Sequence, residues 1–119
     1  MDLDSALESH AGWKIKLRAA IDGESTLDAA SIGRDDCCAL GRWLHGEARR
    51  QFPNSPTLAD CAARHAAFHC EAGKVATAIN ARRYDEADAM LGPATPYNAA
   101  SMAVGASIVR LKRSVAAAA

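Results

Sequence analysis

At 119 residues the chain is long enough for one domain with a hydrophobic core and too short for two. Alanine is abundant, aromatic residues make up only 5% of the chain and β-branched residues are few, which favours closely packed helices over a sheet. The formal net charge is zero, with both signs mixed along the chain, so no strong field is available to collect nucleic acid or an anionic membrane.

The N-terminal half predicts two helices. Residues 3–21 form an amphipathic pattern in which Leu3, Leu7 and Leu17 share an apolar seam with His10. Residues 22–26 end this helix, and residues 27–36 are expected to be a loop that can hold one helical turn. A short helix is predicted over residues 36–52, with the acidic pair 35–36 capping its start and the segment PNSP ending it.

The C-terminal half predicts a long helix that starts at Ser55, because proline is tolerated in the first helical turn. Its expected inward positions are Leu58, Cys61, His65, Phe68, Ala72, Val75 and Ile79. A further helical segment covers residues 84–91, and the segment GPATP must interrupt the path since each proline removes a helical hydrogen bond. The last helix has an apolar seam formed by Val104, Ile108, Leu111 and Val115.

These elements predict an all-α fold, a small antiparallel helical bundle (four main helices, one short) with a buried zinc site. The expected domain covers residues 1–116, and residues 117–119 are expected to be a disordered tail. No apolar run is long enough to span a bilayer, and the acidic start MDLDSALESH is unlike a signal or transit peptide. A cytoplasmic location is the default expectation, and the four cysteines are then expected to be thiols, metal ligands or redox centres.

The segment RHAAFHC places His65 and His69 four residues apart, which stacks both imidazoles on one helix face. His10 also lies on a predicted inward face. A single buried histidine is more often a hydrogen-bonded core residue than a ligand, but three of them together would need several separate partners. One metal ion satisfies all three, and neutral imidazole combined with a thiolate matches the preference of zinc.

The residues alone leave the choice of thiolate open. Cys61 lies one turn before His65 on the same face, so the helix geometry permits it. Cys38 lies on a different helix and would tie a third chain segment to the ion, which contributes more to folding. Cys37 and Cys70 each lie one residue, about 100° of helix rotation, from a favoured position, so both are expected to face elsewhere.

Three separated segments resemble one family. DDCCALGRWLHG closely resembles the Cys-x-Leu-Gly-x-Trp-Leu signature of the chemoreceptor zinc-binding domain, in which Gly41 and Trp43 are not explained by helical periodicity. HAGW and HAAFH resemble the other two ligand segments of that family in the same order, and SMAVGASIVRLKRS is similar to its final helix. The resemblance implies four zinc ligands, with a thiolate that is not Cys61: His10, Cys38, His65 and His69.

The resemblance further implies a homodimeric bundle attached to a chemotaxis receptor or a diguanylate cyclase. Members of the family sense zinc and, in some cases, oxidation of the zinc-bound cysteine by hypochlorous acid. The predicted function is therefore a zinc-binding regulatory domain that signals to a chemotaxis or cyclic di-GMP output, with Cys38 as the redox-sensing thiol. No nucleic acid and no membrane span are expected among its partners.

Two alternative functions compete with sensing. In the first, zinc is a structural staple of a dimerisation bundle, which predicts that the zinc-free chain unfolds. In the second, the chain is a zinc hydrolase. HAAFH has Ala66 where the HExxH motif has its glutamate base, and three imidazoles with one thiolate leave no position for a substrate water. A non-enzymatic domain is therefore predicted.

Overall fold

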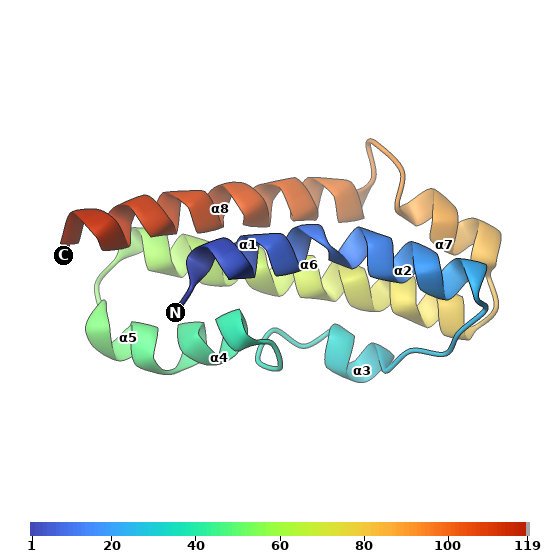
Figure 1. Cartoon of the computed structure of the whole chain (residues 1–119), viewed down its shortest axis with the longest axis horizontal. Helices are drawn as coiled ribbons and strands as arrows, with labels where there is room; N and C mark the ends of the chain where they lie inside the picture. The colour runs from blue at the N-terminus through green and yellow to red at the C-terminus, as the bar shows by residue number, and fades with distance from the viewer. Residues whose placement is uncertain (119) are drawn as a thin grey trace.

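The computed structural model describes residues 1–118 and shows, over that range, a chain built from helices alone (Figure 1). The predicted all-α class is confirmed. In chain order the helices are α1 (Leu3–Ala11), α2 (Trp13–Asp22), α3 (Ala29–Ile32), α4 (Ala39–His45), α5 (Glu47–Gln51), α6 (Pro56–Asn80), α7 (Tyr84–Met90) and α8 (Pro96–Ala118).

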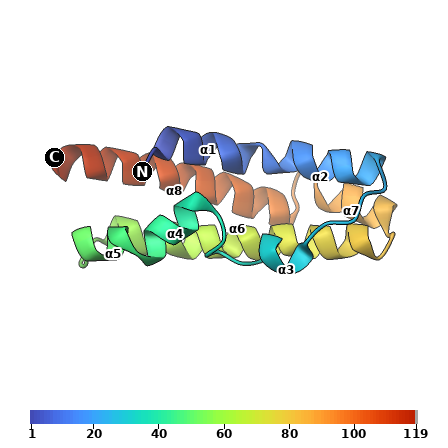
Figure 2. The same ribbon diagram turned by 60° about the horizontal axis from the view of Figure 1, so that its bottom comes forward.

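The helices form an antiparallel bundle whose chain reverses direction at each end. In Figures 1 and 2, α1 and α2 run along one side in line, and the chain then returns through α3, α4 and α5. The long helix α6 runs back beside them, α7 closes the far end, and α8 returns antiparallel to α6. The α6–α8 pair forms the most extensive helix contact, and it builds most of the core.

The predicted first helix over residues 3–21 is divided in two at Gly12. Gly12 remains in the right-handed helical region, with φ −74° and ψ −14°, and its carbonyl accepts the N–H of Lys16 at 3.2 Å. The two helices therefore continue along nearly one line, as Figure 1 shows. Glycine at this position weakens the helix because it has the largest backbone freedom to lose.

The predicted short helix requires a correction at its start. The acidic residues do not cap it, since Cys38 is the N-cap of α4 and its sulfur accepts the N–H of Gly41 at 3.3 Å. Asp36 instead pairs with the guanidinium of Arg34 at 2.9 Å. A sulfur can replace the usual oxygen here because the orphan N–H groups of a first turn need only an acceptor.

The same predicted helix is also divided, at Gly46. The backbone there leaves the helical region, with φ −115° and ψ −103°, and α5 begins at the next residue. The interruption separates α4, which packs against α6, from α5.

The predicted start and inward face of α6 are confirmed. The Ser55 hydroxyl accepts the N–H of Leu58 at 3.1 Å, and Pro56 occupies the first turn. The side chains expected to point inward are all buried: Leu58, Cys61, His65, Phe68, Ala72, Val75 and Ile79. On α8, three of the four seam residues are buried and Val115 is half-buried. The core thus contains the helix faces that hydrophobic periodicity predicted for α6 and α8.

The end of α8 extends further than the predicted domain boundary. Residues 117 and 118 belong to the helix, and residue 119 of the predicted tail lies outside the described residues. Alanine has the highest helix propensity, so the terminal run can continue the helix. Across residues 1–118, no helix is both long enough and apolar enough to cross a lipid bilayer.

Candidate metal centre

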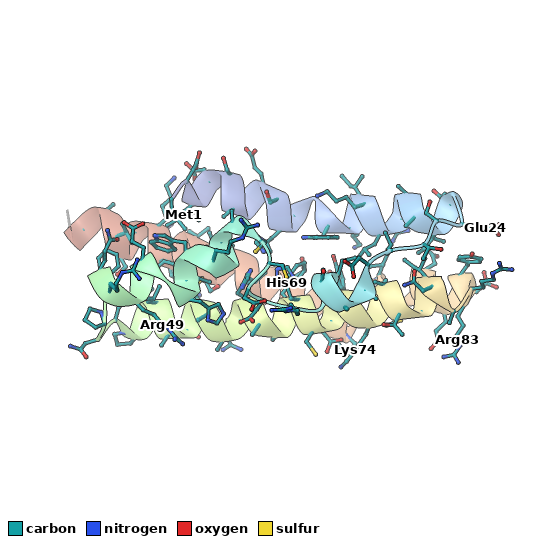
Figure 3. All side chains as sticks on the ribbon, turned by 90° about the horizontal axis from the view of Figure 1, so that it is seen from below. Met1, Glu24, Arg49, His69, Lys74 and Arg83 are labelled. Carbon is teal, nitrogen blue, oxygen red and sulfur yellow. The ribbon has the colours of Figure 1, made fainter. Side chains whose placement is uncertain are left out.

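The four residues predicted as metal ligands lie together in the interior. His10 comes from the last turn of α1, Cys38 from the cap of α4, and His65 and His69 from successive turns of α6. Figure 3 marks His69 near the middle of the molecule. One donor atom from each of the four lies within 4.8 Å of every other, and the three imidazoles are buried while the thiol is half-buried.

Four of the six distances between these donors are close to the edges of a zinc coordination tetrahedron. The Nε2 atoms of His10 and His69 are 3.3 Å apart. The Cys38 sulfur is 3.2, 3.7 and 4.0 Å from the Nε2 atoms of His65, His69 and His10 respectively. Zn–N bonds of about 2.0–2.1 Å and Zn–S bonds of about 2.3 Å give N···N edges of roughly 3.3 Å and N···S edges of roughly 3.6 Å. The residues therefore fit zinc.

Two of the three imidazoles are oriented by backbone carbonyls. Nδ1 of His10 donates to the Ala6 carbonyl at 2.7 Å, and Nδ1 of His69 donates to the Ile32 carbonyl at 2.9 Å. Because a carbonyl can only accept, Nδ1 of each ring carries the proton, and Nε2 presents its lone pair to the centre. Such outer hydrogen bonds fix the tautomer that a metal-binding histidine needs.

The third imidazole differs in its surroundings. Within the described part of the chain, Nδ1 of His65 is buried and has no hydrogen-bond partner. Burial lowers the pKa of His65 to about 3, with further lowering by the nearby His69 and His10 rings and an opposing effect of the Asp35 carboxylate. Burial also lowers the pKa of His10. Both rings are therefore neutral at pH 7, which is the form that binds a metal ion.

The glycine of the signature is explained by the approach of the segment that precedes α4. A Cβ atom added to Gly41 would lie 1.8 Å from the backbone oxygen of Asp35. This contact lets the chain fold back over the first turn of α4, where the Gly41 N–H also reaches the Cys38 sulfur. Helical periodicity could not show this requirement, because it arises from a tertiary contact.

A second glycine contact positions His69. A Cβ atom on Gly73 would lie 2.7 Å from the Cα atom of Gly33, so α3 and α6 meet backbone to backbone. Gly33 follows Ile32, whose carbonyl accepts the proton of the His69 ring. The close approach of two glycines therefore places the acceptor for one ligand histidine. Nothing in the spacing of the sequence indicated this pair.

The structure places one of the four cysteines beside the three imidazoles. Cys61 is buried on α6 beside Ser107 of α8, outside the cluster of donors, and burial raises the pKa of its thiol. Cys37 is half-buried, with its sulfur 3.7 Å from a carboxylate oxygen of Asp36. Cys70 is exposed. Cys38 is therefore the cysteine whose sulfur faces the three imidazoles.

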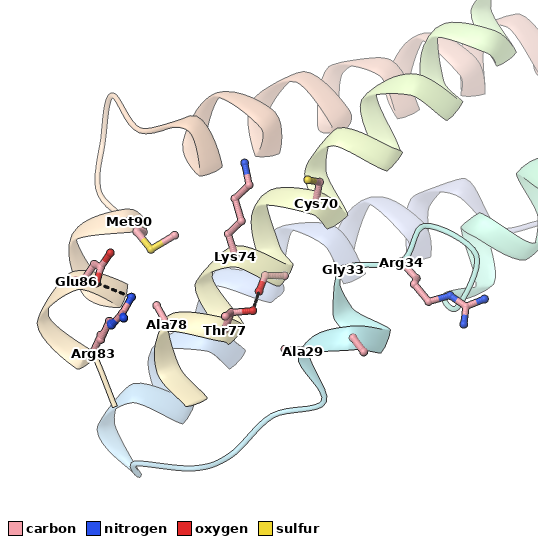
Figure 4. Close-up of a pocket in the computed structure, with 12 residues that line it drawn as sticks. Ala29, Gly33, Arg34, Cys70, Lys74, Thr77, Ala78, Arg83, Glu86 and Met90 are labelled. Atoms are coloured by element: carbon pink, nitrogen blue, oxygen red, sulfur yellow. Dashed lines mark hydrogen bonds and ion pairs between the residues drawn. The ribbon is translucent and has the colours of Figure 1, made fainter. Parts of the chain in front are cut away.

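Two surface hollows lie near the four donor residues, and donor residues line only one of the two. The larger, about 570 Å³, is an open groove between α3, α6 and α7, shown in Figure 4 with Cys70 and Lys74 at its side. None of the four donor residues lines it. A second cavity of about 360 Å³ lies between α1 and α4, and His10 and Cys38 are part of its lining.

One family model matches the chain. It is the model of the chemoreceptor zinc-binding domain, and it covers residues 10–76, which is more than half of the sequence. The matched range begins at His10 and includes all four donor residues. No curated protein and no solved structure matches the chain.

Proposed function

Since the chain belongs to the chemoreceptor zinc-binding domain family, a family of regulatory zinc-binding domains, we propose that His10, Cys38, His65 and His69 are its zinc ligands. We further propose that the domain reports zinc level or oxidation of Cys38 to a chemotaxis or diguanylate cyclase output. The observation that carries the proposal is the convergence of four donors from three chain segments at tetrahedral distances.

The donor set favours regulation over catalysis. Bound zinc would supply a reversible crosslink between α1, α6 and the segment before α4. Within residues 1–118, no carboxylate belongs to the donor cluster, so a general base of the HExxH kind is missing at the position of Ala66. Four protein ligands also fill a tetrahedral site and leave no position for a substrate water. These features support a non-enzymatic domain.

Cys38 is the donor best placed to transmit a signal. The three histidines lie within α1 and α6, which belong to the core, whereas Cys38 begins the short helix α4. Oxidation of the sulfur weakens it as a ligand. The segment from Cys38 through α4 would then be held only by packing, through the buried side chains of Leu40 and Leu44, and would be freer to change its contact with an output domain.

The first test joins zinc content to oxidation. We expect one zinc per chain, and a limiting dose of hypochlorous acid should release zinc in proportion to oxidised Cys38, because sulfur oxidation removes one of four ligands. Peptide mass spectrometry locates the oxidation while a chromophoric chelator follows the released zinc. If zinc stays bound while Cys37, Cys61 or Cys70 oxidises first, the metal centre is not the oxidant detector.

Removal of zinc separates sensing from stapling. The core between α6 and α8 is built from apolar side chains such as Phe68, Ile79 and Leu111, so we expect the zinc-free chain to remain helical by circular dichroism. Zinc at a free concentration 100 times its Kd adds about 2.7 kcal/mol, so chelation should lower Tm by roughly 10 °C. Loss of all helical signal on chelation would instead support the structural staple.

A homodimer, which the resemblance to the family implies, remains part of the proposal. Val104, Ile108 and Leu111 of the α8 seam are buried within the single chain, so they are not free to bind a partner. We propose that the partner contacts a hollow of about 390 Å³ between α1 and α8, which Leu7 and Val109 line together with charged residues such as Lys112. Sedimentation at micromolar concentration should show a dimer, and a monomer alone would contradict it.

A further inference from the structure

The peptide unit that joins Cys37 to Cys38 is held by the side chain of Arg42. From α4, the guanidinium reaches back toward the start of the helix, and its Nη2 and Nε atoms donate to the Cys37 carbonyl oxygen at 2.8 and 3.2 Å. These two N–H groups lie on one edge of a planar guanidinium, and a carbonyl oxygen has two lone pairs to accept both. The contact therefore restrains the position of this peptide unit and the orientation of its plane.

The orientation of that peptide unit helps to decide where the Cys38 sulfur lies. The Cys37 carbonyl and the Cys38 N–H belong to one planar group, so rotating the plane changes the φ angle of Cys38 and the direction of its Cα–Cβ bond. Cys38 has φ −83° and ψ 165°, and its sulfur lies 3.2 Å from Nε2 of His65. Zinc–sulfur distances vary by only about 0.2 Å between sites, so a small displacement of the sulfur weakens the bond.

Other contacts attach α4 and the segment before it independently of Arg42. At the end of α4, Nε2 of His45 donates to the Asp35 carboxylate at 2.9 Å, which ties the segment to the helix a second time. The side chains of Leu40 and Leu44 are buried, and α4 packs against α6. We therefore expect a variant that loses the Arg42 guanidinium to fold and to keep α4 in place.

We propose that Arg42 is a positioning residue of the metal centre, which holds the peptide unit before Cys38 in the orientation that directs the sulfur to the metal. The inference rests on the proposed role of Cys38 as the thiolate ligand. Arg42 acts through the backbone, because its hydrogen bonds end on the Cys37 carbonyl and not on a donor atom. Backbone carbonyls orient the imidazoles of His10 and His69 in a comparable way, and outer contacts of this kind set metal affinity.

Two neutral variants of equal length separate hydrogen bonding from charge. In Arg42→Gln the amide nitrogen takes the place of Nε and can still donate to the Cys37 carbonyl, whereas Arg42→Met has a methyl group there. We expect the zinc Kd to rise about tenfold in Arg42→Met, the low end of such effects because the side chain is exposed. In Arg42→Gln it should rise about threefold, since a neutral hydrogen bond is about half as strong as a charge-assisted one.

Cobalt(II) provides a readout that a general loss of stability would not move. It binds the same nitrogen and sulfur donors as zinc, and its sulfur-to-cobalt charge-transfer absorption arises only from a bound thiolate. With saturating cobalt, this absorption should be strong in the wild type, weaker in Arg42→Met and largely kept in Arg42→Gln. Chelator competition measures the zinc Kd of each variant. Arg50→Met, at an exposed position of α5, is the matched control and should leave both measurements unchanged.

The outcomes separate this inference from the function on which it rests. If the wild type lacks the thiolate absorption, Cys38 is not a ligand, and the proposed ligand set and the inference fail together. If the wild type shows it and Arg42→Met keeps both the absorption and the wild-type zinc Kd, the zinc site stands and the inference is wrong. If Arg42→Gln loses as much as Arg42→Met, the charge of the guanidinium matters and its hydrogen bonds do not, which also overturns the positioning role.

Discussion

Cys38→Ala is expected to weaken zinc binding by about two orders of magnitude or more. Structural zinc sites gain about 10–16 kcal/mol from four ligands, so removing one costs on the order of 3 kcal/mol, which corresponds to about 100-fold in Kd. The variant should keep its helical content, because the sulfur lies at the edge of the core and not within the α6–α8 contact. Competition with a chromophoric chelator measures the change in Kd.

Cys61→Ala is the matched control for this result. It also replaces a cysteine by alanine, but at a buried position on α6 outside the donor cluster. We expect its zinc Kd to stay close to that of the wild type, while the free energy of unfolding falls by about 1 kcal/mol through loss of packing. If Cys61→Ala lost zinc and Cys38→Ala retained it, the proposed ligand set would be wrong.

Gly41→Ala is expected to damage both stability and zinc binding without touching a donor atom. Its methyl group would lie 1.8 Å from the Asp35 backbone oxygen, so either α4 or the preceding segment must move. Strain of this kind costs about 1–3 kcal/mol. The displacement also moves the Cys38 sulfur, so we expect zinc affinity to fall about tenfold or more, on the scale of second-shell effects. Urea unfolding of the zinc-loaded chain, with chelator competition, measures both.

Gly105→Ala provides the same substitution at a position with room. A Cβ atom there meets the Leu7 side chain of α1 at 3.7 Å, which is an ordinary contact distance. Replacing glycine by alanine within a helix should raise the free energy of unfolding by up to about 1 kcal/mol and leave zinc binding unchanged. Equal losses in the two variants would show that the backbone contact at Gly41 is not responsible.

Periodicity was sufficient to predict the helical class and the buried face of α6. Residues such as Leu58, Phe68 and Val75 recur at helical spacing, and that spacing alone determines which side chains share a face. It was not sufficient to predict where helices divide. The breaks at Gly12 and Gly46 depend on how neighbouring helices cover the core, and a glycine inside a periodic pattern is tolerated as often as it interrupts.

The residue types of the candidate site could be predicted from the sequence, but the backbone groups that orient the ligand side chains could not. Resemblance to a family supplied the choice of Cys38 over Cys61, which helix geometry had left open. The acceptors of the two oriented rings, at Ala6 and Ile32, are backbone atoms and leave no residue-type signal. The helix cap was mispredicted because acidic side chains are commoner caps than sulfur, and the position of Cys38 is decided by the three imidazoles that surround it.

The division of the donors into three nitrogens and one sulfur has a consequence for metal selectivity. The imidazoles come from α1 and α6, and two of them are held by carbonyls whether or not the sulfur is intact. Thiolate is a soft ligand that suits zinc and copper(I), whereas nitrogen donors alone also suit nickel and copper(II). Oxidation of Cys38 would therefore remove the soft ligand and leave three imidazoles in position. A domain that has lost zinc in this way would then bind nickel or copper(II).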